Sequence, residues 1–109
     1  MITFYDVLSE VKMTDIVYLA GTNVNKIYLD NIRGIMANVS NGGTVAIEIV
    51  PEPNNPFDPK ALRVDFNGSV VGYIPKASQY LFTTPKIPQI EKWGLTEKEN
   101  AYCYLRLTG

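Results

Sequence analysis

Residues 61–74 read ALRVDFNGSVVGYI, a pattern typical of two short strands joined by a tight turn. Apolar and polar residues alternate through residues 61–66, as in a strand that buries one face. Asn67 and Gly68 follow, and both tolerate the positive φ angles that a two-residue hairpin turn requires. Residues 69–74 are largely apolar and fit the returning strand. The stretch therefore predicts a β-hairpin near the middle of the chain.

Three further strands are predicted outside this hairpin. Residues 16–20 form a short apolar run, while residues 44–50 and 101–107 alternate apolar and polar side chains. The total is then five or six strands, which makes the chain mainly β. Because short strands leave many unpaired edges, we expect a small closed or nearly closed barrel.

Two or three short helices complete the prediction. Apolar residues recur every three or four positions in residues 28–39, and residues 76–82 follow a proline that suits a first helical turn. Residues 2–11 fit a short helix, although their first half also fits a strand. Residues 83–100 are expected to be irregular, apart from a possible helical turn near residues 90–93.

The composition narrows the classes of function. The chain has 109 residues, which predicts one domain over residues 1–109, with no histidine and one cysteine. Ser-His-Asp and Cys-His catalysis, histidine-ligated zinc and an internal disulfide are therefore excluded. With no disulfide and no long apolar run, a cytoplasmic location is expected. No cofactor is expected either.

The charge is uneven along the chain although it nearly cancels overall. Residues 1–58 hold three basic and seven acidic residues, a sum of −4, whereas residues 59–109 hold seven basic and four acidic ones, a sum of +3. A net charge of −1 does not by itself indicate a nucleic-acid-binding protein. A local basic patch is still compatible with it, and scattered solvated charges are the alternative.

Between the strand at residues 44–50 and the hairpin lies a segment that we call the proline loop, residues 51–59, with the sequence PEPNNPFDP. Proline fixes its own φ angle, lacks a backbone donor and pushes the preceding residue towards extended geometry. The proline loop can therefore be neither helix nor central strand. It has little conformational entropy left to lose, which suits it to presenting side chains in a fixed arrangement.

The proline loop and the hairpin together resemble a known family. Residues 52–64 read EPNNPFDPKALRV and residues 71–76 read VGYIPK. They resemble the signature of the HIRAN family, roughly E-P-x-N-P-[YF]-D-x-x-A-[IL]-x-V followed by V-G-[YH]-[IL]-[PK]-[KR]. Residues 17–22, VYLAGT, look like the opening strand of the family. The specific match covers residues 44–76 and a looser one residues 16–84.

The resemblance implies an OB-like β-barrel that binds DNA, with the best-understood members holding the 3′ end of a single strand. Members occur fused to Swi2/Snf2-type remodelling ATPases and fork-processing enzymes, and also as free-standing bacterial and phage proteins. A free-standing member would be the recognition module alone, acting in DNA repair or replication-fork processing. The partners that the resemblance implies are single-stranded DNA ends and a helicase or remodelling ATPase.

The resemblance also implies which residues form the DNA site. By their place in the motif these are Asn54, Asn55, Phe57, Asp58, Tyr73 and Lys76. Lys60 and Arg63 join them as phosphate contacts if the hairpin forms, the alternative being solvated charges on an exposed strand face.

One part of the family pattern is missing. An arginine and an aromatic residue usually follow the glycine of the first strand, but residues 23–25 read NVN here. Tyr28 is a candidate replacement for the lost aromatic platform, and either Tyr80 or Phe82 for a later one.

Each of these residues also has a purely structural interpretation. The Asp58 carboxylate either accepts a hydrogen bond from the terminal hydroxyl of a strand or caps the turn before Pro59. Phe57 either stacks on a base or anchors the loop on the barrel. Tyr73 is as well suited to the core as to DNA.

The other candidate side chains of the loop and the strands are also expected to be either structural or in contact with a ligand. We expect Asn54 to be mainly structural and Asn55 mainly a ligand contact, although both fit turn positions. Lys76 follows the returning strand, where it can reach a phosphate. Cys103 is expected to be a buried structural thiol, and Trp93 to pack a short helical segment onto the barrel.

Two other functions compete with DNA binding. A protein-interaction module of the same fold fits the missing arginine and aromatic pair. A metal-dependent nuclease needs clustered acids, and Glu52 and Asp58 share a loop without a convincing third acid. We therefore do not expect an enzyme.

Overall fold

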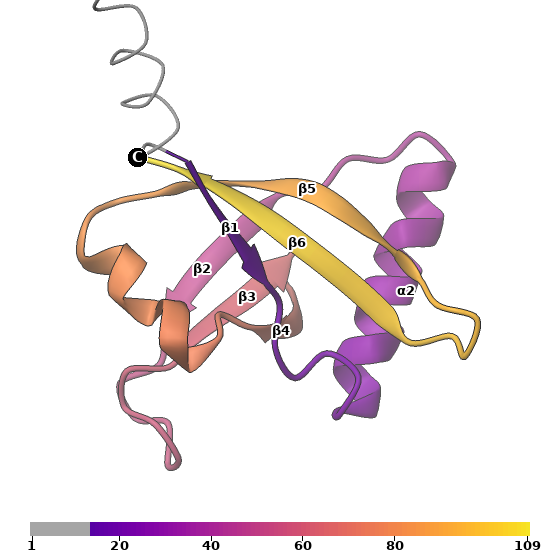
Figure 1. Ribbon diagram of the computed structural model, residues 1–109. Helices are drawn as coiled ribbons and strands as arrows, with labels where there is room; N and C mark the ends of the chain where they lie inside the picture. Colours follow the sequence, from indigo (N-terminus) through magenta and orange to yellow (C-terminus); the bar gives the residue numbers. More distant parts are fainter. Residues whose placement is uncertain (1–13) are drawn as a thin grey trace, which may run out of the picture.

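The computed structural model describes residues 14–109, which form six strands in two antiparallel three-stranded sheets together with two helices (Figure 1). The segment considered for a helix or strand at residues 2–11 lies outside the described residues. In chain order the elements are β1 (Thr14–Tyr18), α2 (Lys26–Ser40), β2 (Ile47–Pro51), β3 (Leu62–Phe66), β4 (Ser69–Tyr73), the 3₁₀ helix η1 (Lys76–Thr83), β5 (Ile87–Leu95) and β6 (Ala101–Thr108).

The first sheet has the order β2-β3-β4 and contains the predicted hairpin. The turn between β3 and β4 has Asn67 at φ 52° and Gly68 at φ 82°, so the hairpin prediction is confirmed. The Asn67 side chain also accepts a hydrogen bond from the amide of Ala46 at 2.7 Å and donates one to the carbonyl of Thr44 at 3.0 Å. Because Asn67 holds these residues, β2 begins at Ile47, three residues later than predicted.

The second sheet has the order β1-β6-β5 and contains a strand that the sequence did not predict. The prediction of irregular structure at residues 83–100 is wrong, because β5 covers residues 87–95. A register shift between Ile90 and Lys92 inserts one extra residue into β5. Such a bulge places Ile90 and Trp93 three residues apart on one face, a spacing that resembles a helix. Pro88 is tolerated because β5 is an edge strand.

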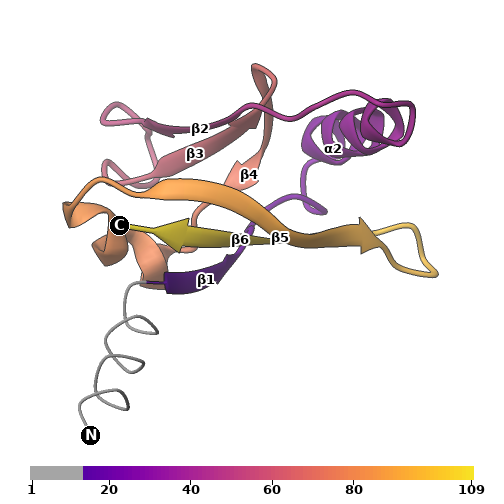
Figure 2. The same ribbon diagram turned by 90° about the horizontal axis from the view of Figure 1, so that it is seen from above.

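The two sheets pack face to face around one core, with α2 to one side (Figure 2). The residues buried between the sheets include Val64, Phe66, Cys103, Leu105 and Leu107, so the prediction for Cys103 is confirmed. Burial raises the pKa of the Cys103 thiol to about 12, which leaves it neutral and inert as a nucleophile.

Trp93 is not on a helical segment, contrary to the prediction. It lies on β5, and its ring meets that of Phe66 edge-on, with 6.1 Å between the ring centroids. This contact joins the two sheets across the core.

Helix α2 covers β4 and confirms the predicted helix at residues 28–39. Ile32 and Ile35 are its buried residues, and the Asn31 side chain donates a hydrogen bond of 2.7 Å to the carbonyl of Val70. No helix within residues 14–109 is long and apolar enough to cross a membrane.

The predicted closed barrel is wrong, because the described strands form two separate sheets. The sheets are linked where the chain leaves β1. There the amides of Ala20 and Tyr73 each donate to the carbonyl of the other at 2.9 Å. This bridge ties the end of β1 to the end of β4.

Gly72 lets this bridge form. A Cβ atom at position 72 would lie 2.7 Å from both the carbonyl oxygen of Ala20 and the hydroxyl of Thr22. That hydroxyl is buried and donates a 2.7 Å hydrogen bond to the carbonyl of Val71. The missing side chain at position 72 therefore makes room for the backbone that follows β1.

We expect Gly72→Ala to lower the free energy of unfolding by about 1–3 kcal/mol, because the added methyl group must displace backbone atoms. Gly34→Ala is the matched control: position 34 lies in α2 with open space around it, so alanine should raise stability by about 0.5–1 kcal/mol. Urea denaturation of both variants measures the two changes. Equal stability of Gly72→Ala and the wild type would show that the bridge is not sterically restricted.

Candidate functional site

Hydrogen bonds close the proline loop at its base and hold the backbone inside it. The amide of Glu52 donates to the carbonyl of Ala61 at 3.0 Å, which continues the pairing of β2 with β3. Asn55 Oδ1 accepts hydrogen bonds from the amides of Phe57 and Asp58 at 2.9 and 3.0 Å. The backbone that carries Phe57 and Asp58 is therefore held by both proline geometry and hydrogen bonds.

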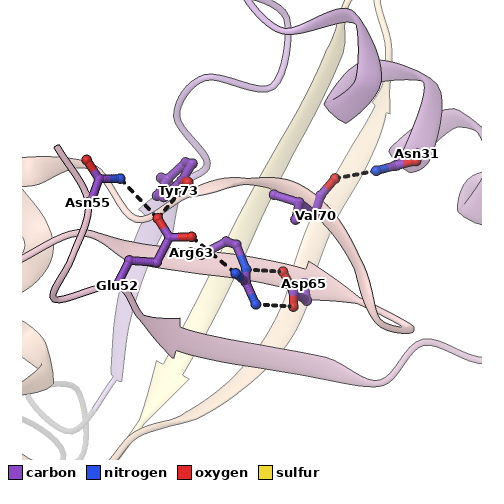
Figure 3. A network of polar contacts seen from close by, with 7 residues as sticks. All are labelled: Asn31, Glu52, Asn55, Arg63, Asp65, Val70 and Tyr73. Carbon is purple, nitrogen blue, oxygen red and sulfur yellow. Dashed lines mark hydrogen bonds and ion pairs between the residues drawn. The ribbon is translucent and has the colours of Figure 1, made fainter. Parts of the chain in front are cut away.

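Glu52 anchors the proline loop to the hairpin (Figure 3). Its carboxylate accepts hydrogen bonds from Asn55 Nδ2 at 3.0 Å, from the Tyr73 hydroxyl at 2.8 Å and from Arg63 Nη1 at 3.1 Å. The bonds from Asn55 and Tyr73, and then that from Arg63, lower the pKa of the Glu52 carboxyl. Glu52 is thus an ionised acceptor that joins three segments of the chain.

Arg63 is engaged in the same network. Besides Glu52 it binds Asp65, with Nε and Nη2 lying 2.9 and 3.1 Å from the two carboxylate oxygens. Its two acidic partners, Asp65 first, raise the pKa of the guanidinium. Two carboxylates thus give Arg63 a structural role and offset its charge, which disfavours the phosphate contact that stays a prediction for this residue.

The proline loop, β4 and η1 surround an open pocket of about 280 Å³, which we call the Asp58 pocket. It is lined by Ala20, Asn55, Phe57, Asp58, Ala61, Tyr73, Ile74, Pro75, Lys76 and Gln79. Five of the eight residues predicted for the DNA site thus lie together here. Asn54, Lys60 and Arg63 are not part of its lining.

Asp58 is the best-organised polar group of the pocket. One oxygen accepts a hydrogen bond from the amide of Lys60 at 2.9 Å, and the other accepts one from Gln79 Nε2 at 2.8 Å. The bond from Gln79, then that from Lys60, lowers the pKa of the Asp58 carboxyl, and the charges of Lys76 and Lys60 add to the effect. A carboxylate accepts about four hydrogen bonds, so two sites stay open to a ligand.

The sequence analysis missed Gln79. A signal was present, because Gln79 follows Lys76 by three residues in the predicted helix, and residues at that spacing share a helical face. The turn-capping role predicted as the alternative for Asp58 is also present, in its bond to Lys60. The two interpretations of Asp58 are therefore compatible.

The hydrogen bonds of the proline loop give a structural role to Asn55, whereas the ligand contact predicted for it stays a prediction. Asn55 was expected to contact a ligand, yet its amide group is occupied by Glu52, Phe57 and Asp58. Asn54 was expected to be structural, yet it is exposed and lies in a separate hollow along the outer side of the proline loop. The asparagine of an Asn-Pro pair at a turn accepts hydrogen bonds from the amides that follow it. This explains why Asn55, which precedes Pro56, makes these bonds rather than Asn54.

Tyr73 lines the pocket, and Tyr28 lies next to Tyr73. The Tyr73 hydroxyl is used by Glu52, and burial followed by this hydrogen bond raises its pKa well above the usual value. Tyr28, on the first turn of α2, lies with its ring centroid 6.2 Å from that of Tyr73. Tyr28, the candidate replacement for the missing aromatic platform, is therefore next to a residue that lines the pocket.

Of residues 23–25, where the resemblance implies an arginine and an aromatic residue, Asn23 and Asn25 have structural roles. Asn23 pairs with Ala101 of β6 through two side-chain hydrogen bonds of 2.7 Å, one donated and one accepted. Asn25 caps α2 by accepting from the amides of Ile27 and Tyr28. Val24 between them is 92% exposed.

A second hollow of about 600 Å³ adjoins the Asp58 pocket and shares Lys76 and Gln79 with it. Lys60, Tyr80 and Phe82 are among its lining residues. Tyr80 is 68% exposed, whereas Phe82 packs partly against the core. Of the two late aromatics considered, Tyr80 is thus the one available to a ligand.

Comparison of the chain with family models, curated proteins and solved structures gave no match. The resemblance to the HIRAN family therefore stays a prediction, carried by the residues of the proline loop and the hairpin.

We expect Glu52→Gln to lower the free energy of unfolding at pH 7 by about 1–2 kcal/mol, because it removes the charge that accepts three hydrogen bonds. The folded-state pKa of Glu52 is lowered, so its stabilisation is complete above the unfolded pKa, about 4.3, and is lost as the pH falls through the folded value. The difference between variant and wild type should narrow from pH 7 to pH 3. Chemical denaturation at both pH values measures it, and a constant difference would contradict the role given to the charge.

Proposed function

We propose that this protein is a DNA-binding module that seats the 3′-hydroxyl end of a single strand in the Asp58 pocket. The observation that carries the proposal is the meeting of three chemically different groups at one hollow. These are the ionised carboxylate of Asp58, the ammonium of Lys76 and the ring of Phe57, which is 94% exposed. An exposed phenyl ring on a rigid loop is available for stacking without a change in the fold.

Each group has a distinct task in this proposal. Phe57 stacks on the terminal base, which is sequence-tolerant and contributes about 1–3 kcal/mol. Lys76 attracts the phosphate that precedes the terminal sugar. Asp58 accepts a hydrogen bond from the terminal hydroxyl and repels a phosphate at the same position. The carboxylate thereby distinguishes a free end from a phosphorylated end or the interior of a strand.

The cellular role follows from the resemblance to the HIRAN family. A module that holds a free 3′ end would act in DNA repair or at replication forks. It would work with a helicase or remodelling ATPase supplied by another chain or domain.

The test compares two fluorescent oligonucleotides that differ only in carrying a 3′-hydroxyl or a 3′-phosphate. Fluorescence anisotropy should show tighter binding of the 3′-hydroxyl form by the wild type, because Asp58 gains a hydrogen bond from the hydroxyl and repels the phosphate. Asp58→Asn removes the repulsion and should bring the two affinities together. Equal binding of both oligonucleotides by the wild type would overturn the role of Asp58.

Salt dependence provides a separate measurement. With Arg63 neutralised, Lys60 and Lys76 are the two basic residues at the pocket and the adjoining hollow. Two phosphate contacts predict a slope of about −1.4 for log K against log salt concentration. Arg63→Gln, if it folds, should leave this slope unchanged, whereas Lys76→Gln should lower its magnitude by about 0.7.

Phe57→Ala should weaken binding by roughly 5- to 150-fold, the equivalent of one lost base stack. The thermal unfolding midpoint should stay unchanged, because the ring is almost wholly exposed. Val24→Ala is the control, since Val24 is equally exposed but lies outside the pocket. Phe57→Tyr should bind at least as tightly as the wild type, and a loss of binding in the control would show that the assay reports general surface changes.

A protein-interaction module is the second candidate, favoured by the exposed apolar side chains Val24 and Ile27 at the start of α2. It predicts no change of anisotropy with either oligonucleotide at low salt, together with a specific protein partner whose binding Ile27→Asp abolishes.

A further inference from the structure

The outer face of the β1-β6-β5 sheet, the side turned away from the core, carries three tyrosines that have no part in the proposed function. We call Tyr18, Tyr104 and Tyr102 the tyrosine row. Tyr18 and Tyr104 are paired across β1 and β6, with 4.8 Å between their ring centroids, and Tyr102 meets Tyr104 edge-on at 6.3 Å. Tyr18 is 49% and Tyr104 36% exposed, so ring surface is open to solvent.

The rest of this face carries the exposed apolar residues Ile16 and Ile87 beside polar and charged side chains. Lys92 is paired with Tyr104 across β5 and β6, so its side chain leaves the sheet on the same face. Arg106 lies two residues beyond Tyr104 and contacts Glu91 at 3.3 Å and Gln89 at 3.2 Å. Because Glu91 pairs with Arg106, Lys92 is the basic side chain named here that a phosphate can reach without displacing a carboxylate. Exposed aromatic rings beside a basic side chain on a sheet form the kind of surface on which unpaired bases stack.

The tyrosine row is continuous with the Asp58 pocket through β1. Burial alternates along the chain here: Val17 and Leu19 face the core, whereas Ile16, Tyr18 and Ala20 face outwards or stand at the surface. Ala20 lines the Asp58 pocket and forms the bridge to Tyr73. Tyr18 precedes Ala20 by two residues, which is about 7 Å along an extended chain.

The views of the whole molecule agree with this path. β1 and β6 lie in front of β2 and β3 in Figure 1, so the outer face of their sheet is turned to the viewer. The chain that leaves β1 then runs down past β4, with which Ala20 is paired.

We propose that the tyrosine row binds the nucleotides that precede the 3′ end of the same single strand. The inference rests on the proposed function, since it assumes that the last nucleotide sits in the Asp58 pocket. From there the strand passes over Tyr18 and Tyr104, whose rings stack with its bases, while Lys92 lies near its phosphates. The site then holds a short segment of strand as well as its end.

The experiment measures the affinity of 3′-hydroxyl oligothymidylates of two to ten nucleotides for the full chain. The wild type should bind the longer oligonucleotides at least about fivefold more tightly than the dinucleotide, which corresponds to one added stack. Tyr18→Ala and Tyr104→Ala should bind the dinucleotide like the wild type and lose the gain with length. Tyr18→Phe, which keeps the ring, should retain the gain, and Ser40→Ala at the exposed end of α2 should behave like the wild type.

The outcomes separate the two proposals. If the dinucleotide and the decanucleotide bind equally, or if both alanine variants retain the gain with length, the tyrosine row is not a nucleotide-binding surface, even though the end-binding function stands. If no oligonucleotide binds at any length, both proposals fail. The thermal unfolding midpoint of each variant verifies that the sheet is intact.

Discussion

The bridge between Ala20 and Tyr73 is the constraint on which the arrangement of this protein depends. Two backbone hydrogen bonds of 2.9 Å join the end of β1 in one sheet to the end of β4 in the other. They form because Gly72 leaves room for the carbonyl of Ala20 and the hydroxyl of Thr22. The same two residues, Ala20 and Tyr73, line the Asp58 pocket. Packing of the two sheets therefore also determines the shape of the candidate site.

The proline loop keeps its conformation through limited backbone freedom and hydrogen bonds rather than through burial. Its prolines reduce the number of conformations open to the unfolded chain. In the folded chain, Glu52 and Asn55 form hydrogen bonds with the polar groups of the loop. Phe57 and Asp58 can then remain exposed or half-buried in a defined geometry at little further entropic cost. This arrangement suits a binding site whose ligand must find its contacts already in place.

The charges of the molecule show why net charge is a poor guide to such a site. Arg63 and Arg106 are accompanied by carboxylates, so they contribute little to the local field. Lys76 lines the Asp58 pocket and Lys60 the adjoining hollow, and both lower the pKa of the Asp58 carboxyl. A surface of mixed sign fits the ligand that we propose, a phosphodiester strand that ends in a hydroxyl.

The sequence by itself determined the local elements whose signals are short in range. The hairpin at Asn67-Gly68, helix α2, β6 and the stiffness of the proline loop each follow from neighbouring residues, because turn angles, periodicity and proline geometry are local properties. It also placed Phe57, Asp58 and Lys76 in one candidate site. Only the tertiary structure decided the rest. It showed β5, whose bulge interrupts the alternation of apolar and polar residues, and the pairing of the strands into two sheets. It also showed the hydrogen-bond partners of Asn55, Arg63 and Gln79. Those features depend on residues far apart in the chain, and a local pattern carries no information about which distant group will satisfy a given side chain.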